Sequence, residues 1–231
     1  MSSNIVKSFF VILLLSHVLT GTAQSATNLC REPAPKPCKT IKTWAKCTEM
    51  GCIDSAWSEK KKQEHRDANP KKNRSDDPGT MGFTTVTMAQ LMKKGNDRAR
   101  FQDGTKVELV AFMMEARAGS PESCNCGFTD DLHADKHIYL VAKKNVTDKK
   151  KAVIAEVAPR MREALGKQSD WTCQKLNADF QGQWVKVRGY MFYDKEHEPS
   201  CPRFTPKGKN LWRNTCWEIH PITSIEVTTA P

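Results

Sequence analysis

Alternation of apolar and polar residues from residue 106 onwards predicts a series of β-strands. Val153, Ala155 and Val157 show it most clearly, because residues two apart in a strand share one face. Further strands are predicted where apolar and β-branched residues dominate. The predicted strands cover residues 106–115, 136–142, 152–157, 183–193 and 217–227.

Two short helices are predicted beside these strands. Thr87 is a suitable N-cap for the first helix, and Gln90 completes a capping box with it. Pro159 begins the second helix and Gly166 ends it, between the third and fourth strands. The order of three strands, one helix and two strands is that of a five-stranded Greek-key barrel of the OB type. We therefore expect a mainly β, OB-like barrel, with a small α+β sandwich as the alternative.

The first 26 residues have the composition of a signal peptide. Lys7 supplies the positive charge, residues 8–18 form an apolar core too short to span a bilayer, and small residues follow. No later apolar run in the sequence approaches the length of a membrane span. We expect cleavage after Ala23 or Ala26 and an exported protein, either periplasmic or secreted.

A basic, cysteine-rich arm of residues 27–79 is expected to precede the barrel domain of residues 80–231. A short helix in the arm should start after Asp54 or Ser55 and continue to about His65. All nine cysteines follow the cleavage site, and an oxidising compartment favours disulfides. The odd number leaves at least one thiol without a partner in the chain. At least one disulfide is expected among the arm cysteines, which are Cys30, Cys38, Cys47 and Cys52.

The net charge of +10 indicates attraction to polyanions, and lysine-rich runs at 60–62 and 71–74 concentrate this charge in the arm. Nucleic acid is the leading candidate partner, and an anionic cell-wall polymer is another. On the predicted strand 183–193, aromatic and cationic residues alternate along one face, which suits stacking on bases with cations at the phosphates. The candidate binding residues are Trp184, Lys186, Arg188, Tyr190 and Phe192. Alternatively, these aromatics pack beneath the arm as a second small core.

Carboxylates and histidines recur together in three predicted strands or at their ends, as Asp-x-His, Asp-x-x-His and Glu-x-His. Both groups serve in acid–base catalysis and in zinc or manganese sites. If the strand ends meet at one rim of the barrel, they can form a single site, with Asp135 behind the ligands. The candidate catalytic residues are His137, Asp194, His197, Glu218 and His220, and the candidate metal ligands are His137, His197 and His220. Alternatively, each carboxylate orients a histidine in a purely structural network.

A second candidate zinc site combines Cys124 and Cys126 with His133 and His137. The histidine spacing is that of a zinc finger, but the cysteines are closer together than the usual pair. Disulfide formation competes with zinc in an oxidising compartment.

Several stretches resemble a family of uncharacterised exported bacterial proteins with OB-like cores. These stretches are 122–126, 135–137, 189–197 and the block Trp217-Glu218-Ile219-His220-Pro221. The resemblance extends over residues 105–227. It implies the barrel fold and export, and it implies no activity.

Several common enzyme classes lack their signatures in this sequence. There is no Gly-x-Ser-x-Gly elbow, His-Glu-x-x-His helix or phosphate-binding glycine loop. The leading hypothesis is an exported protein that binds an anionic polymer. The alternatives are a metal-dependent hydrolase of phosphodiester or glycan substrates and a structural or protein-interaction module, so the sequence leaves open whether the protein is an enzyme.

Overall fold

The structure is a computed structural model that describes residues 29–36, 38–202 and 211–231. The predicted signal peptide, residues 1–26, lies outside the described residues. Within the described ranges, no helix is both long enough and apolar enough to cross a membrane.

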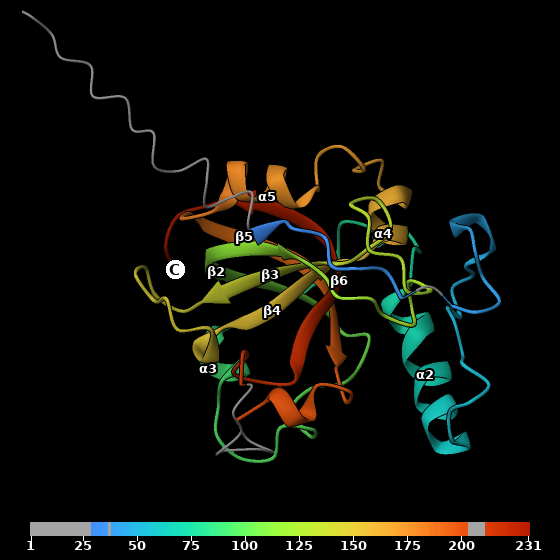
Figure 1. Cartoon of the computed structure of the whole chain (residues 1–231). Helices are drawn as coiled ribbons and strands as arrows, with labels where there is room; N and C mark the ends of the chain where they lie inside the picture. Colours follow the sequence, from blue (N-terminus) through green and yellow to red (C-terminus); the bar gives the residue numbers. More distant parts are fainter. Residues whose placement is uncertain (1–28, 37, 203–210) are drawn as a thin grey trace, which may run out of the picture.

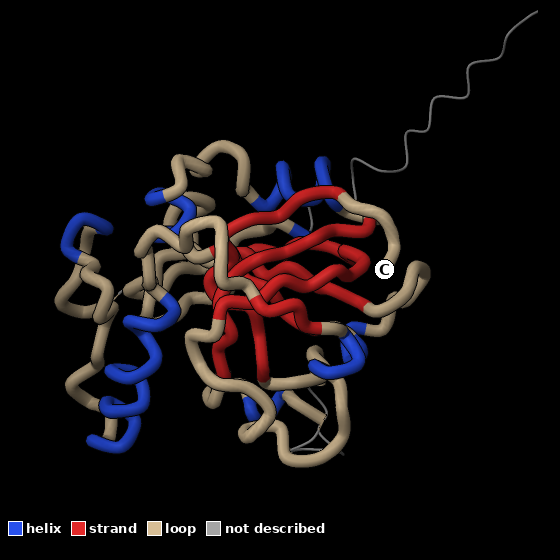
Figure 2. Tube along the Cα trace, turned by 180° about the vertical axis from the view of Figure 1, so that it is seen from behind, coloured by secondary structure: helices blue, strands red, loops and turns tan. Residues whose placement is uncertain are grey.

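Five strands close into a barrel, seen from two sides in Figures 1 and 2. They are β2 (Lys106–Ala118), β3 (Lys136–Val141), β4 (Val153–Val157), β5 (Trp184–Tyr193) and β6 (Trp217–Val227). The strand order is β2-β3-β4-β6-β5, and pairing of β2 with β5 closes the barrel. Neighbouring strands are antiparallel except β4 and β6, which are parallel. The predicted OB-like Greek-key barrel is confirmed.

The longest strand, β2, pairs with both β3 and β5 and so closes the barrel. Residues 106–112 pair with β5 and residues 112–118 pair with β3, and a register shift between Met113 and Glu115 lies within the part that pairs with β3. Gly189 marks a second register shift, between β5 and β6. A Cβ atom at this position would lie 2.5 Å from the carbonyl oxygen of Pro221, so the close approach of the two strands requires glycine.

The barrel interior holds the main apolar core. Inward-facing residues alternate along each strand, as the two-residue period predicts. The strands β3 and β4 are nevertheless buried along their whole length, so their outward-facing residues are covered as well. This second buried face is apolar at Tyr139 and Ile154 but charged at the neighbouring positions His137 and Glu156.

The helices of the described ranges are short. The capping box at Thr87 and the helix start at Pro159 are confirmed, whereas a helix capped by Thr172 was not predicted. The helices are α2 (Glu59–Lys72), α3 (Met88–Leu91), α4 (Pro159–Ala164) and α5 (Cys173–Phe180), with 3-10 turns at Trp44–Lys46, Lys149–Lys151 and Glu198–Ser200. A short strand, β1 (Thr84–Val86), adds to β2 in parallel.

The arm helix α2 lies alongside the barrel (Figure 1). It begins after the N-cap Ser58 and ends at Lys72, so the predicted helix from 54 or 55 to about 65 was placed too early. Its buried residues are polar: His65, Asn69 and Lys72 lie four and three positions apart on one side. This segment therefore lacks the apolar stripe by which an amphipathic helix is predicted from sequence.

Disulfides hold the arm to the barrel. The expected bridge within the arm is confirmed, and two more bridges connect the arm with residues of the barrel domain. The pairs are Cys38–Cys52, Cys47–Cys126, Cys30–Cys173 and Cys201–Cys216. The remaining cysteine, Cys124, is free and buried.

Candidate metal centre

A cluster of charged side chains is buried on the outer face of the barrel. His137 of β3 pairs with Glu156 of β4 in the strand register, and both project outward, opposite the core residues of their strands. Glu218 and His220 project from β6 onto the same face and are at most 1% exposed. The outer face of the second and third strands is where OB barrels bind their ligands.

Loops and the arm helix complete this cluster. Glu122 comes from the β2–β3 loop, and Asp194 and Arg213 come from the connection between β5 and β6. Lys72 reaches the cluster from the last turn of α2. These two loops are the ones that flank the ligand in OB barrels, so the cluster occupies the usual ligand-binding region.

The half of the cluster nearest α2 is a chain in which basic and acidic side chains alternate. Lys72 Nζ lies 2.7 Å from Glu122 Oε2, and Glu122 Oε1 lies 3.9 Å from His137 Nε2. His137 Nε2 in turn lies 3.3 Å from Glu156 Oε1. The Glu122 and His137 side chains are each only 10% exposed, so the protein and not solvent surrounds these charges.

The other half continues from Glu156 through β6. Both Glu156 Oε2 and Glu218 Oε1 lie 3.1 Å from His220 Nδ1. Arg213 joins Glu218 to Asp194: its Nη2 is 2.5 Å from Glu218 Oε2 and its Nη1 is 2.9 Å from Asp194 Oδ2. One buried network therefore runs from the arm helix to β6.

Several atoms of this network have no hydrogen-bond partner among the described residues. They are Glu122 Oε1, His137 Nε2, Glu156 Oε2 and His220 Nε2. Charged neighbours lie close to them, but none is placed in hydrogen-bond geometry. A buried polar atom without a partner costs about 1–3 kcal/mol, so a bound water or a cation at these positions would stabilise the cluster.

Glu122, His137 and Glu156 form a group that could hold a metal ion. One ligand atom from each lies within 4.8 Å of the others. Imidazole and carboxylate together suit zinc or manganese, and three protein ligands leave a coordination position for water. A cation placed among them would satisfy Glu122 Oε1 and His137 Nε2, two of the atoms that lack hydrogen-bond partners.

The net negative charge of the cluster also favours a bound cation. The carboxylates are Glu122, Asp135, Glu156, Asp194 and Glu218, and all five side chains are at least nine-tenths buried. Of the described residues, Lys72 and Arg213 are the permanent cations in direct contact with them. Five negative and two positive charges leave three negative charges, which either protonated histidines or a metal ion must balance.

Buried charges shift the pKa values of this network strongly. Burial disfavours the charged form of His220, but Glu156 and Glu218 outweigh it and hold the pKa of His220 well above its usual range. Burial, with the neighbouring carboxylates of Glu122 and Glu156, raises the pKa of Asp135 to about 6 despite the opposing effect of His220. Such perturbed carboxyl and imidazole groups cluster at functional sites.

Asp194 and His197 form a dyad at the edge of the cluster. His197 Nδ1 donates to Asp194 Oδ2, while Arg213 holds Asp194 from another side. Burial opposes the charge on His197, but the bond to Asp194 raises the pKa of His197 to about 9. The imidazole is therefore protonated at neutral pH, and its side chain is still 25% exposed. A charged imidazole with access to solvent can act as a general acid.

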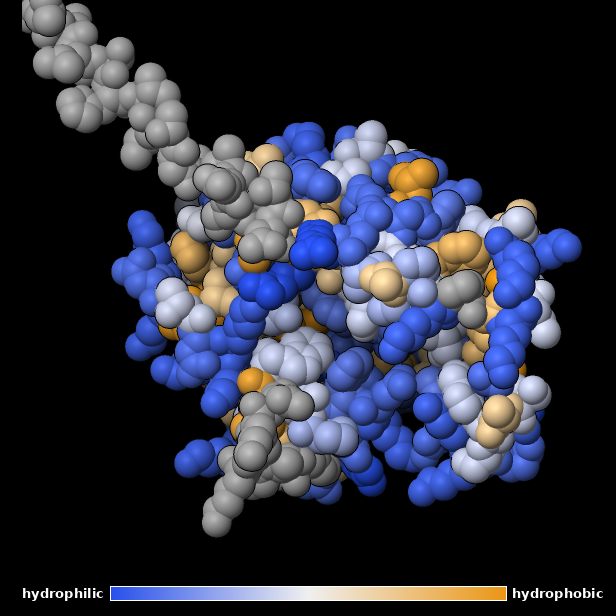
Figure 3. Space-filling view, in the orientation of Figure 1, coloured by the Kyte–Doolittle hydropathy of each residue, from blue (hydrophilic) through white to orange (hydrophobic). Residues whose placement is uncertain are grey.

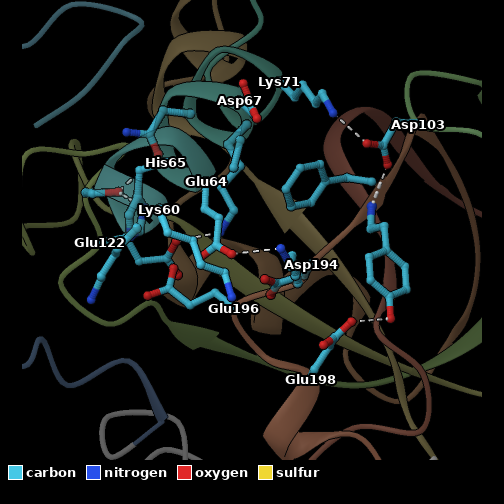
Figure 4. A pocket seen from close by; sticks show the side chains of 18 of the residues that line it. Lys60, Glu64, His65, Asp67, Lys71, Asp103, Glu122, Asp194, Glu196 and Glu198 are labelled. Atoms are coloured by element: carbon cyan, nitrogen blue, oxygen red, sulfur yellow. Dashed lines mark hydrogen bonds and ion pairs between the residues drawn. The ribbon is translucent and has the colours of Figure 1, made fainter. Parts of the chain in front are cut away.

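Two cavities meet at Glu122. One, of about 750 Å³, lies between α2 and the segment after β5 and is lined by Glu122 and Asp194 (Figure 4). The other, of about 410 Å³, is lined by Glu122 and His197 and by Trp57 and His65 of the arm. Glu122 is therefore the member of the metal group through which a ligand could reach the cluster. On the face seen in Figure 3, hydrophilic residues predominate and hydrophobic ones lie in small separate groups.

All five candidate catalytic residues from the sequence lie in this one network. Of the three predicted metal ligands, His137 belongs to the group with Glu122 and Glu156, and His220 belongs to a group with Asp135 and Glu156. His197 lies in neither of these groups and instead contacts Asp194. The three histidines thus do not share one set of ligands among the residues described, and their role in metal binding stays a prediction.

Sequence reasoning missed Glu122, Glu156, Lys72 and Arg213. Glu156 had a usable signal, because it is a lone acidic residue within an otherwise apolar strand. The outer face of this strand is covered by loop residues such as Trp212, which the sequence pattern of the strand does not reveal. Arg213 and Lys72 lie in a loop and on a polar helix face, where no periodic signal distinguishes them.

The alternative zinc site at the Cys-x-Cys motif is wrong. Cys126 forms a disulfide with Cys47, so its sulfur is not available as a thiolate ligand. His133 instead pairs with Asp130 at 2.8 Å. Burial raises the pKa of the remaining Cys124 thiol well above its usual range, and the nearby carboxylates raise it further.

Two of the candidate binding aromatics on β5 are covered. Tyr190 is 2% exposed and lies under the guanidinium of Arg74, 3.9 Å from its ring centre. Phe192 is 4% exposed and packs edge-on against His220 at 5.8 Å. Tyr190 clusters with Ala158 and Met161, and Phe192 lies under Lys72 of the arm. Both rings are therefore covered in part by arm residues, which agrees with the alternative considered from the sequence.

The other candidate binding residues on β5 have partners within the barrel. Lys186 pairs with Glu226 at 2.6 Å, and Trp184 packs edge-on against Phe112 at 5.8 Å. Arg188 is similarly engaged, at 2.6 Å from Glu108. The β5 face is therefore not an open row of aromatics, and ligand binding through it stays a prediction.

Comparison with known proteins adds no assignment. Neither protein-family models nor curated proteins match this chain. The buried cluster is therefore the feature of this protein that indicates a function.

Proposed function

We propose that this protein is an exported hydrolase that uses a divalent metal ion, held by Glu122, His137 and Glu156, to cleave phosphodiester bonds in an anionic polymer. The observation that carries the proposal is the group of buried ligand atoms without hydrogen-bond partners on the ligand-binding face of the barrel. Glu122 connects this group to the larger cavity.

The metal ion and the dyad would have complementary roles. A divalent ion polarises a phosphoryl oxygen and lowers the pKa of bound water. His197, protonated at neutral pH and lining a cavity, supplies the proton for the leaving oxygen. Asp194 orients the imidazole, and Arg213 fixes Asp194.

The charge distribution supports a polyanionic substrate. The chain carries a net charge of +10, and the exposed Lys60 and Lys61 on α2 line the larger cavity beside its carboxylates. These lysines favour a polymer of phosphodiesters over a neutral glycan. Nucleic acid is the first substrate to test, and an anionic cell-wall polymer is the second.

Export is part of the proposal. Four disulfides are compatible with an oxidising compartment outside the cytoplasm. The composition of the first 26 residues is that of a signal peptide. Detection of the mature chain in culture medium or periplasm, with its new N-terminus, would test this part.

The direct test is incubation of the mature protein with labelled single-stranded RNA and DNA, with added manganese or zinc and with a chelator. Cleavage that needs metal and is abolished in Glu122→Gln and His137→Gln supports the proposal. Glu163→Gln changes an exposed acidic residue of α4 away from the cluster, and this control should cleave normally. The absence of cleavage of any tested polymer in the metal-loaded protein would contradict the hydrolase assignment.

Binding without cleavage is the second candidate, and the exposed lysines of α2 favour it. In that case Lys60→Ala with Lys61→Ala should weaken retention of nucleic acid, and the loss should be larger at low salt. Glu122→Gln should bind as well as the wild type. Loss of cleavage in Glu122→Gln therefore supports the hydrolase, whereas loss of retention confined to the lysine variant supports binding without cleavage.

A further inference from the structure

Glu156 belongs to two groups of possible metal ligands at once. It closes one group with Glu122 and His137 and another with Asp135 and His220. Its Oε1 atom faces His137 Nε2 at 3.3 Å, and its Oε2 atom faces His220 Nδ1 at 3.1 Å. The two oxygens of one carboxylate therefore point to different histidines.

Hydrogen bonding within the protein leaves the His220 side of Glu156 unsatisfied. His220 Nδ1 can carry a single proton, yet Glu218 Oε1 and Glu156 Oε2 both lie 3.1 Å from it. Glu218 is in hydrogen-bond geometry with this nitrogen, and Glu156 Oε2 has no hydrogen-bond partner among the described residues. Glu156 is 2% exposed, so bulk solvent does not reach this side chain.

Asp135 completes the second group from the start of β3. It is 1% exposed, and its Oδ2 atom accepts from Asn125 Nδ2 at 2.6 Å. The Oδ1 atom of Asn125, which is fully buried, also lacks a hydrogen-bond partner in the described part of the chain. Asn125 Oδ1 and His220 Nε2 thus both lack hydrogen-bond partners among the described residues. Oxygen and nitrogen atoms of these kinds bind divalent cations.

We infer that Asp135, Glu156 and His220 form a second cation site, and that Glu156 bridges it to the first site to make a binuclear centre. The inference rests on the proposed first ion at Glu122, His137 and Glu156. Each ion would receive one histidine and one carboxylate of its own, with Glu156 shared. Lys72 and Arg213 contact Glu122, Asp194 and Glu218. Among the described residues, this leaves Asp135 and Glu156 without a permanent cation in direct contact, so a second ion would compensate the buried Asp135 carboxylate, which the first ion does not. Paired ions of this kind clamp both oxygens of an in-line displacement at phosphorus.

The test is the number of manganese ions held by the intact mature protein, counted by native mass spectrometry after loading and removal of excess metal. The wild type and the control Glu163→Gln should hold two ions. Asp135→Asn should hold one ion, Glu122→Gln should hold the other one, and Glu156→Gln should hold none. Asparagine and glutamine keep the size of the side chains they replace, and circular dichroism confirms the fold of each variant.

A spectroscopic measurement on the wild type makes the test independent of the variants. Two manganese ions bridged by one carboxylate are spin-coupled and give a multiline electron paramagnetic resonance spectrum, whereas a single ion gives six lines. A single ion with a six-line spectrum, unchanged in Asp135→Asn, would overturn the second site and leave the proposed first site standing. A protein that holds no manganese or zinc would overturn both.

Discussion

Lys72 and Glu122 join the arm to the candidate centre through a buried ion pair. The Nζ atom of Lys72 lies 2.7 Å from Glu122 Oε2, and the two side chains are 5% and 10% exposed. Glu122 is also a member of the proposed metal group. The last turn of α2 therefore contributes a positive charge directly beside the position proposed for a metal ion.

Replacement of Lys72 by methionine should destabilise the protein strongly when no metal is present. The change leaves the buried Glu122 carboxylate without its cation, and loss of one partner of a buried pair costs about 3–5 kcal/mol. Manganese should restore more stability to Lys72→Met than it adds to the wild type, because the ion takes over the compensation of Glu122. Urea unfolding with and without manganese measures both effects.

Lys71→Met is the matched control for this experiment. Lys71 precedes Lys72 in α2, but its ion pair with Asp103 is exposed, with 49% of the lysine side chain accessible. Exposed pairs contribute about 0–1 kcal/mol. Equal losses in the two variants would contradict the role assigned to Lys72.

The stability of the protein should decrease between neutral and alkaline pH because of His197. Burial lowers the pKa of this histidine, but Asp194 outweighs burial and raises it from 6.5 to about 9. The folded protein therefore binds the proton more tightly than the unfolded chain. The resulting stabilisation is complete below about pH 6.5 and is lost as the pH rises through about 9, a change of about 3 kcal/mol.

Urea unfolding at a series of pH values measures this dependence. His197→Gln should remove it, so that the decrease between pH 6.5 and 9 becomes smaller by a corresponding amount. An unchanged slope in the variant would show that the dyad does not hold the extra proton.

The disulfides should contribute unequally to stability. Cys47–Cys126 spans 79 residues and ties the arm to the barrel, whereas Cys38–Cys52 spans 14 residues within the arm. In the chain-entropy description, the longer loop adds about 1.5 kcal/mol more stability than the shorter loop. Double alanine variants of each pair, compared by thermal and urea unfolding, should show this order. The reverse order would mean that the arm is held mainly by contacts other than the Cys47–Cys126 bridge.

The buried aromatic Phe192 should act through stability and not through ligand contact. Phe192→Ala removes a ring packed against His220 and near Lys72, and such truncations cost about 3–5 kcal/mol. Trp184→Ala, at a half-buried position of the same strand face, should have a smaller effect on unfolding. A Phe192→Ala protein of normal stability that no longer binds nucleic acid would show instead that β5 forms a stacking surface.

The sequence by itself determined most of the barrel. Strand alternation in residues 153–157 and helix starts at Thr87 and Pro159 are local signals, since they depend on neighbouring residues and backbone geometry. The nine cysteines likewise indicated an arm stabilised by disulfides. The helix α2 was placed too early because its buried side is polar, and hydrophobic periodicity carries no information about such a side.

Only the tertiary structure decided which charged residues form a site. His137, Glu218 and His220 were candidates from spacing alone, but their convergence depends on the parallel pairing of β4 with β6 and on the closure of the barrel. Glu156 became a central residue because loop residues such as Trp212 and Val146 cover the outer face of β3 and β4, which an alternating pattern would leave in water. Periodicity records the face on which a residue lies, whereas burial of that face depends on segments distant in sequence.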